Sequence, residues 1–258
     1  MLTHKLNTVF FSLILLLLIV LSFFVAIAWW AFLLPVVVWF AIAGWGSAFI
    51  ASGYHIRAYC KNNTVQGRQV AITFDDGPTP ETPKVLALLK QYDIKATFFC
   101  IGSQIEKHPD IFQSILNEGH IVGNHTYSHS PKMGFFPMQK VKEELETTNI
   151  LIEKYAGKKA LFFRPPFGVT NPNIAKAVKS TGHYVIGWNI RSLDAVIKDE
   201  SHILKRIVDK LRPGSIILLH DTSQKTVNVL EQLLVFLRKN KYEAITADQL
   251  LNIPAYEE

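Results

Sequence analysis

The sequence predicts an α/β protein in which a (β/α) barrel of about seven units follows an N-terminal transmembrane hairpin. Three observations support this fold class. A long uncharged segment opens the chain, short apolar strand-like runs then alternate with amphipathic runs, and unusual polar residues follow several strand-like runs. In parallel α/β folds the carboxyl ends of the strands meet on one face, where active sites form.

The uncharged segment covers residues 6–54 and is dominated by Phe, Leu, Ile, Val, Trp and Ala. As one helix its roughly 49 residues would reach about 73 Å, whereas a bilayer core is about 30 Å thick. We therefore expect two spans, residues 9–28 and 33–51. The Trp29-Trp30 pair and Pro35 mark their connection, because tryptophan favours the membrane interface and proline breaks helices.

A cleaved signal peptide is the alternative for this segment, but its apolar core would be only about 7–15 residues long. We predict instead a membrane anchor over residues 1–57. Lys5 precedes the spans, and Arg57, Lys61 and Arg68 follow them. A hairpin with both flanks in the cytoplasm obeys the positive-inside rule, and the opposite orientation violates it mildly. The prediction is a two-span protein of a bacterial-type cell membrane, with the side of the soluble part left open.

The soluble part, residues 65–253, is long enough for one domain with a sizeable core. Its β-rich runs are the expected strands. They lie at residues 70–74, 96–101, 120–123, 160–163, 184–188, 215–219 and 243–246.

Amphipathic segments separate these strands, with apolar residues recurring at helical spacing. The clearest sets are Val141, Leu145 and Ile152; Ile203, Ile207 and Leu211; and Leu230, Leu233, Leu234 and Leu237. The alternation of strand and helix implies a parallel sheet covered by helices. Periodicity does not separate an open sheet from a closed barrel, but about seven units favour the barrel.

The amino-acid composition limits the kinds of binding partner that this protein could have. The net charge is +6 with neutral histidines, and part of this excess lies beside the membrane, where it suits anionic lipid. No cluster of basic and aromatic residues indicates nucleic acid, so we predict no nucleic-acid partner. Cys60 and Cys100 are the only cysteines, and they do not define a redox compartment.

Two acidic residues and two histidines are the most informative polar groups. Residues 73–78 read TFDDGP and leave Asp75 and Asp76 at the end of a strand. His125 and His129 are four residues apart, which places both on one face if that stretch is a helical turn. Two histidines and one carboxylate, with a position for water, form the ligand set of a hydrolytic zinc site. The spare carboxylate could act as a base, so the pattern predicts a metal-dependent hydrolase.

Further polar residues follow later strands. Arg164 follows the fourth strand, Asp194 lies just beyond the fifth, and His220-Asp221 end the sixth. In a barrel all of them lie on the carboxyl-terminal rim. Each also has a plain structural interpretation: a loop arginine, a helix N-cap and a core histidine.

These segments together resemble the polysaccharide deacetylases, the NodB-homology enzymes of carbohydrate esterase family 4. The matching motifs are, in order, TFDDGP at 73–78, HTYSH at 125–129, RPPFG at 164–168, Asp194 and ILLHD at 217–221. The resemblance covers essentially the whole soluble part. It implies a distorted (β/α) barrel and the removal of N- or O-acetyl groups from chitin, peptidoglycan, xylan or related glycans.

The resemblance also implies a metal site. Asp76, His125 and His129 would hold a divalent ion, with Zn²⁺ expected and other divalent transition metals as alternatives. Asp75 would be the general base that takes a proton from the attacking water.

The remaining roles follow from the same resemblance. His220 would be the general acid that protonates the leaving amine, Asp194 would orient His220, and Arg164 would pair with Asp75 and keep it ionised. The backbone N–H of Phe167 would add an oxyanion donor. The implied substrate-binding residues are Pro165, Phe167, Gly168 and Leu218.

One motif departs from the family pattern. Where the family usually has Asp-x-x-Asp-Trp, this chain has Arg191, Asp194 and Ala195 at the three named positions. The second acid is present, but the first acid is an arginine and the tryptophan is an alanine. Since the tryptophan would help to wall the acetyl pocket, the departure concerns acceptor specificity and pocket size.

Three functional hypotheses follow. The first is a membrane-anchored deacetylase of N-acetylated amino sugars in an envelope glycan, either peptidoglycan or a chitin-like N-acetylglucosamine polymer. The second is a cytoplasm-facing deacetylase or deformylase of a lipid-linked amino sugar, which the hairpin topology favours. The third is a catalytically silent, membrane-tethered glycan-binding module, whose only support is the pair Arg191 and Ala195.

Overall fold

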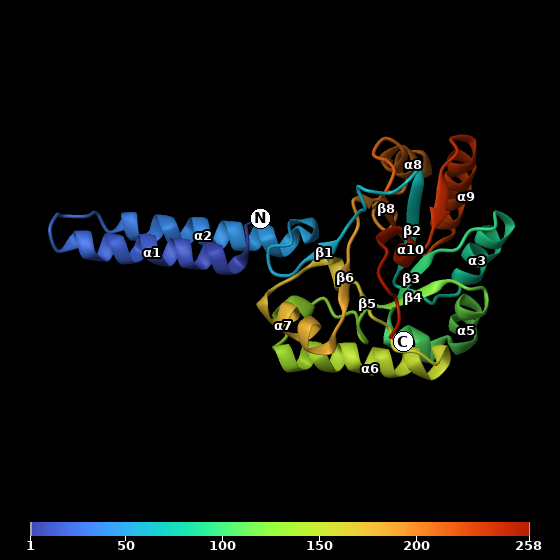
Figure 1. The fold of residues 1–258 in the computed structure, drawn as a ribbon, viewed down its shortest axis with the longest axis horizontal. Helices are drawn as coiled ribbons and strands as arrows, with labels where there is room; N and C mark the ends of the chain where they lie inside the picture. The colour runs from blue at the N-terminus through green and yellow to red at the C-terminus, as the bar shows by residue number, and fades with distance from the viewer. Residues whose placement is uncertain (1, 258) are drawn as a thin grey trace.

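The structure is a computed structural model that describes residues 2–257. A long helical hairpin projects from a domain built on a curled parallel sheet with helices packed on it (Figure 1). This is the α/β class that the sequence predicts.

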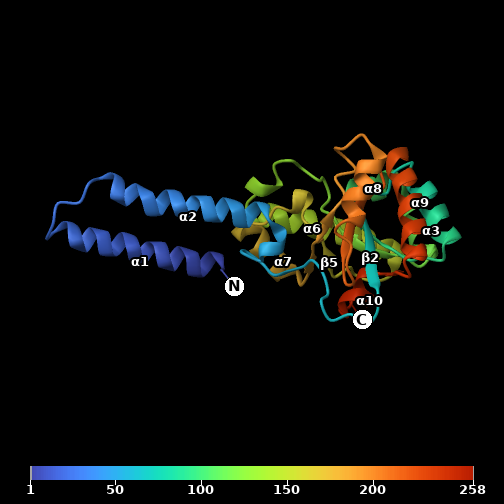
Figure 2. The same ribbon diagram turned by 90° about the horizontal axis from the view of Figure 1, so that it is seen from above.

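The hairpin consists of α1 (His4–Ser22) and α2 (Trp30–Ala48), joined by residues 23–29. Its connection lies at the far end from the domain, while the start of α1 lies at the domain end in both views (Figures 1 and 2). Both helices are long and apolar enough to cross a bilayer. Pro35 lies inside α2, so the helix break expected at this proline is wrong. A proline this close to a helix start removes only one backbone hydrogen bond, which the apolar helix tolerates.

The base of the hairpin is tied to the domain. Asn7 donates from Nδ2 to the Tyr54 hydroxyl at 2.7 Å. A Cβ at Gly46 would lie 2.3 Å from the Tyr54 ring, so only glycine allows this close packing. The Thr170 N–H also donates to the Ser47 carbonyl at 3.0 Å. The end of α2 is therefore held against the barrel.

Within residues 2–257 nine strands form one sheet in the order β1-β6-β5-β4-β3-β2-β8-β7, and β9 pairs with the start of β2. All named pairings are parallel. The strands are β1 (Ala58–Tyr59), β2 (Gln69–Asp75), β3 (Thr97–Cys100), β4 (Ile121–Asn124), β5 (Phe162–Phe163), β6 (Tyr184–Ile186), β7 (Ile190–Arg191), β8 (Ile216–His220) and β9 (Glu243–Ile245). All seven predicted strands are confirmed, with shifts at their ends.

The barrel is curled but not closed, since its end strands β1 and β7 do not pair within residues 2–257. The chain between β6 and β7 crosses this opening. Gly187 donates its N–H to the carbonyl of Tyr59 in β1 at 2.9 Å, and Asn189 donates to the carbonyl of Ile216 in β8 at 3.3 Å. Strands β1 and β7 were not predicted, because two residues carry no readable alternation.

Helices cover the sheet (Figure 2). They are α3 (Thr82–Gln91), α4 (Gly102–Lys107), α5 (Pro109–Asn117), α6 (Met138–Ala156), α7 (Pro172–Thr181), α8 (Glu200–Val208), α9 (Gln224–Lys239) and α10 (Ala247–Leu251), with short 3₁₀ turns at Ile50–Ser52, Met133–Phe135 and Pro166–Gly168. The predicted apolar residues are buried and fall on α6, α8 and α9, except for Leu211, which is buried just beyond the end of α8. Side chains at several starts cap the helix; Ser223, for example, accepts from the Thr226 N–H of α9.

The main core lies between the central strands and these helices. Phe74 of β2 stacks on Phe98 of β3 with ring centroids 4.9 Å apart. Leu230 and Leu234 of α9 belong to the same cluster of buried side chains. This rigid centre fixes the ends of β2 and β8, from which the polar residues emerge.

The apolar face of α9 gives a matched pair of stability tests. Leu234 is fully buried and its neighbour Val235 is 51% exposed. We expect Leu234→Ala to lower the free energy of unfolding by about 2–5 kcal/mol, because it leaves a cavity in the core. Val235→Ala should change it by less than about 0.5 kcal/mol. Denaturant titration of the detergent-solubilised chain measures both, and equal effects would contradict this core assignment.

Candidate active site

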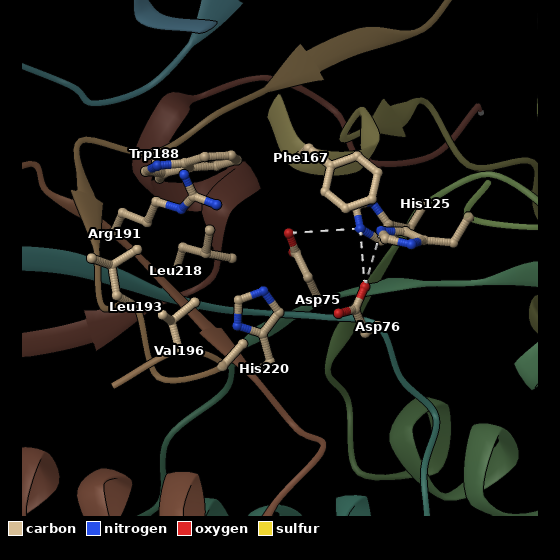
Figure 3. A pocket seen from close by; sticks show the side chains of 12 residues that line it. Asp75, Asp76, His125, Phe167, Trp188, Arg191, Leu193, Val196, Leu218 and His220 are labelled. Carbon is tan, nitrogen blue, oxygen red and sulfur yellow. Dashed lines mark ion pairs between the residues drawn. The ribbon is translucent and has the colours of Figure 1, made fainter. Parts of the chain in front are cut away.

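Strand β2 delivers both acidic residues to the rim of the sheet. Asp75 is its last residue and lies beside Phe99 of β3 and His220 of β8 in the register. Asp76 follows with φ of 74°, a left-handed conformation that turns its side chain out of the strand direction. Both carboxylates face the histidines, and Oδ2 of Asp75 lies 3.8 Å from Nε2 of His125 (Figure 3).

The two histidines lie on an irregular loop after β4, so the helical turn considered for them is wrong. Glu144 of α6 holds this loop from below. Its carboxylate accepts hydrogen bonds from the Tyr127 N–H at 3.0 Å and the Ser128 N–H at 2.7 Å. The loop, rather than helical periodicity, brings His125 and His129 together, with ring centroids 4.9 Å apart.

Asp76, His125 and His129 form one cluster, in which one ligand atom from each lies within 4.8 Å of the others. Oδ1 of Asp76 is 3.4 Å from Nε2 of His125 and 3.3 Å from Nε2 of His129 (Figure 3). Nδ1 of His125 lies 2.7 Å from the Arg164 carbonyl oxygen. Because a carbonyl oxygen only accepts, Nδ1–H is the donor in this contact, and the Nε2 lone pair is left free for a metal.

The donor set fits a divalent cation. Oδ1 of Asp76 is buried and has no hydrogen-bond partner within residues 2–257, and such orphaned oxygens need an explanation. Burial alone would raise the pKa of Asp76, but the adjacent His125 and His129 hold it at about 2. An ionised carboxylate facing two imidazole nitrogens is a suitable three-residue ligand set for zinc.

Arg164 occupies the centre of the barrel and is completely buried. Its Nη1 donates to Oδ1 of Asp75 at 2.7 Å and to the Thr73 hydroxyl at 2.8 Å. Its Nε and Nη2 donate to the carbonyls of Ile186 and Gly187 at 3.0 and 2.9 Å. The ion pair with Arg164 fixes the orientation of the buried Asp75 carboxylate.

His220 and Asp194 form a second hydrogen-bonded pair across the pocket. Nδ1 of His220 lies 2.7 Å from Oδ1 of Asp194, and the His220 N–H donates to Oδ2 at 2.8 Å. The hydroxyls of Ser192 and Thr226 also donate to this buried carboxylate, at 2.7 and 2.8 Å. Asp194 thus fixes the ring of His220 and leaves its Nε2 on the pocket side.

Burial alone would lower the pKa of His220. The hydrogen bond and negative charge of Asp194, together with Asp75 and Asp76, outweigh it and raise the pKa to about 9. At neutral pH the imidazole is therefore cationic and able to donate a proton.

These groups open into one pocket of about 230 Å³. Its lining residues are Asp75, Asp76, His125, His129, Phe167, Trp188, Arg191, Leu193, Ala195, Val196, Leu218 and His220. Figure 3 shows the acids and His125 on one side and Arg191, Leu193 and Val196 on the other.

Two of the predicted substrate-binding residues do not line this pocket. Pro165 and Gly168 are buried beneath it. A Cβ at Gly168 would meet the Trp188 ring at 2.7 Å, so this glycine lets the loop pack on Trp188. The two residues shape the turn that presents Phe167, which has φ of 60° and is half exposed in the pocket. Leu218 and Phe167 are the predicted substrate-binding residues that line the pocket.

The comparisons with known proteins agree with this geometry. The sequence profile described as Polysaccharide deacetylase matches residues 62–186. A peptidoglycan-N-acetylglucosamine deacetylase of Bacillus cereus is 36% identical over 192 residues, covering 70% of this chain and 87% of that protein. The chain belongs to the polysaccharide deacetylase family. The predicted enzyme class, a hydrolase of non-peptide amide bonds, is confirmed.

Solved structures give the same family. A crystal structure of a peptidoglycan N-acetylglucosamine deacetylase in complex with 4-naphthalen-1-yl-N-oxidanyl-benzamide has a TM-score of 0.73 and 31% identity, covering 78% of this chain and 94% of that one. The crystal structure of a pseudoenzyme of carbohydrate esterase family 4 from Bacillus anthracis has a TM-score of 0.70 and 26% identity. The match covers 76% of this chain and 69% of that one. The predicted fold is confirmed.

Sequence reasoning missed several residues of this deacetylase site. Trp188 lines the pocket and was read only as a strand end, although an aromatic residue on the barrel rim was a usable signal. Ser192, Thr226 and Glu144 support the site through hydrogen bonds, and nothing in their spacing marks them. Arg191 and Ala195, the two residues that depart from the family pattern, both line the pocket. Trp188, Leu193 and Val196 form an apolar part of its wall.

The cluster of ligands gives a direct test of metal binding. We expect the full-length protein to retain about one equivalent of zinc after desalting, and His129→Gln to retain much less because one ligand is lost. His202→Gln, on the exposed surface of α8, is the matched control and should retain the parent amount. Elemental analysis of the purified proteins measures this. Full zinc content in His129→Gln would contradict the site.

Proposed function

We propose that this protein removes N-acetyl groups from amino sugars of a cell-envelope glycan, with peptidoglycan or an N-acetylglucosamine polymer as substrate. The observation that carries the proposal is the arrangement of one carboxylate, Asp75, held by Arg164, and one cationic imidazole, His220, around the Asp76–His125–His129 cluster. The peptidoglycan deacetylases among its relatives support this choice of substrate.

Asp76, His125 and His129 would hold the divalent ion. When bound, the ion would lower the pKa of a water molecule and polarise the acetyl carbonyl.

Asp75 would accept the proton of the attacking water, since Arg164 holds its Oδ1 while its Oδ2 faces the histidine cluster. His220 would donate a proton to the amide nitrogen as the carbon–nitrogen bond breaks, because an amine leaves readily only after protonation. Acetate and the free amino sugar are the products. The N–H of Phe167 would add a donor to the developing oxyanion.

Loss of the base gives the first functional test. We expect the purified full-length protein to release acetate from N-acetylglucosamine oligomers, and Asp75→Asn to reduce kcat by at least about 100-fold. Asp93→Asn, at an exposed position with positive φ that asparagine tolerates, is the control and should leave kcat unchanged. Chelation should abolish turnover. A metal-loaded parent that releases no acetate from any amino-sugar substrate would refute the proposal.

The pH dependence tests the acid. The pKa of His220 is raised from its ordinary value of 6.5 to about 9. The ring is therefore protonated at neutral pH and loses its proton as the pH rises through about 9. We expect kcat/KM on the oligomer to fall along a limb near pH 9. Asp194→Asn removes the charge that raises this pKa and should move the limb down by more than about one pH unit. Ser192→Ala keeps that charge and should move it much less. An unmoved limb in Asp194→Asn would contradict the role of His220.

A second candidate substrate is a lipid-linked amino sugar at the cytoplasmic face, cleaved by the same residues as a deacetylase or deformylase. The charge distribution of the hairpin favours it. Lys5, Arg57 and Lys61 lie at the domain end, whereas the distal connection, residues 23–29, carries no charge. By the positive-inside rule the domain end would face the cytoplasm.

Fusions at the C-terminus separate the two candidates. If the substrate is the lipid-linked amino sugar, a fluorescent protein that folds only in the cytoplasm should fluoresce when it is fused to the C-terminus. If the substrate is the envelope glycan, a reporter enzyme that is active only outside the cytoplasm should be active when it is fused to the C-terminus. Reversing the charge bias, with Arg57→Glu and Lys61→Glu together, is the internal check and should weaken an inside orientation.

A further inference from the structure

A second cavity, of about 390 Å³, adjoins the active-site pocket on the side of the hairpin. It shares Phe167, Trp188 and Arg191 with the pocket. Its other walls are Ala48, Phe49, Ile50 and Ala51 at the end of α2, and Asn189, Arg206 and Lys210 of the domain. We call this cavity the basic groove.

The groove is strongly positive. Arg191, Arg206 and Lys210 line it, and no carboxylate does among the described residues. None of these three cations has an ion-pair partner within 4.0 Å in residues 2–257, whereas neighbouring Lys205 pairs with Asp209 at 2.6 Å. Three unpaired cations around one cavity repel one another, and an anion would relieve that repulsion.

Arg191 is held in place at the junction of pocket and groove. Its guanidinium lies 5.9 Å from the Trp188 ring centroid, a distance at which a cation still interacts with the ring face. Nε of Arg206 donates to the Arg191 carbonyl at 2.9 Å. Figure 3 shows Arg191 in front of Trp188, across the pocket from Asp76. An anion bound by Arg191 would therefore be close to the sugar whose acetamide reaches the acids.

The chemistry of the groove favours phosphate. Arginine guanidinium groups bind phosphate oxygens in a bidentate manner, and lysine adds a further charge. The groove also lies at the domain end of α2, where a hairpin in a bilayer would meet the headgroup layer. The family pattern has an acid at the position of Arg191, so this charge is a feature of the present chain.

We propose that the basic groove binds a phosphate group carried by the N-acetylated sugar substrate. This inference rests on the proposed deacetylase function and narrows its substrate class to phosphorylated amino sugars. The phosphate could belong to a lipid carrier or to a water-soluble glycan phosphate, and the lipid carrier fits the position of α2.

Kinetics on three substrates test this with the full-length protein in neutral detergent. The substrates are a neutral N-acetylglucosamine oligomer, N-acetylglucosamine 1-phosphate and a synthetic prenyl diphosphate-linked N-acetylglucosamine. Lys210→Glu should raise KM for the phosphorylated substrates by about tenfold and leave kinetics on the neutral oligomer unchanged. Lys239→Glu, at the exposed end of α9, makes the same charge change and should alter none of them.

The two phosphorylated arms distinguish the source of the phosphate. A lower KM for the prenyl-linked substrate than for the sugar 1-phosphate supports a lipid carrier, and equal values support a water-soluble phosphate. Unchanged KM values in Lys210→Glu would overturn the inference. So would an equal effect of Lys210→Glu on a carboxylate-bearing sugar, N-acetylmuramic acid, because the groove would then be a general anion site.

Binding measured without turnover keeps the inference separate from the proposed function. Calorimetric titration with N-acetylglucosamine 1-phosphate in the presence of a chelator, which stops turnover, should show binding to the parent and to Lys239→Glu, with about tenfold weaker binding to Lys210→Glu. Equal binding by all three proteins would overturn the phosphate site even if acetate is released. Normal binding without acetate release from any substrate would instead refute the deacetylase function.

Discussion

The buried ion pair between Arg164 and Asp75 is the interaction on which the rest of the site depends. A fully buried arginine is costly unless its charge and its donors are satisfied. Here the carboxylate, the Thr73 hydroxyl and the carbonyls of Ile186 and Gly187 satisfy them. Removing either charge would leave the other buried and unpaired, at a cost of about 3–5 kcal/mol.

Arg164 also links groups that act separately. Its side chain orients Asp75, its carbonyl oxygen sets the tautomer of His125, and its bond to Gly187 fixes the segment that leads to Trp188. The base, one metal ligand and one pocket wall therefore share a single anchor in the middle of the barrel. This is why a distortion at Arg164 would reach the whole site.

Backbone strain is concentrated around the same pocket. Four of its lining residues have positive φ, namely Asp76, His129, Phe167 and Leu193, and so has Thr126 in the loop that carries the two histidines. Such conformations cost of order 1 kcal/mol or more each and persist where the surroundings hold them. The parallel core of β2, β3 and β8 supplies that support. As a result, several side chains on loops point into the pocket.

Much of this arrangement was predictable from the sequence, and the exceptions have physical causes. Runs such as residues 70–74 and 215–219 are long and apolar enough to identify as strands, and the polar residues after them mark the rim. Strand β7, with two residues, has no pattern to read. The helix break expected at Pro35 does not occur, because a proline near the start of a helix is tolerated.

Other parts of the site depend on contacts that spacing does not encode. His125 and His129 come together through a loop held by Glu144, not through helical periodicity. The support of Asp194 by Thr226 joins residues 32 positions apart. The basic groove arises only when the end of α2 lies beside β7 and α8, so its lining residues do not form a motif.

The most direct test of this account is anomalous diffraction at the zinc edge from crystals of the full-length protein soaked in Zn²⁺. We predict one strong peak within coordination distance of Asp76 Oδ1, His125 Nε2 and His129 Nε2, with Asp75 remaining bonded to Arg164. A site with no peak there, or a peak bound by other residues while the protein still releases acetate, would contradict it.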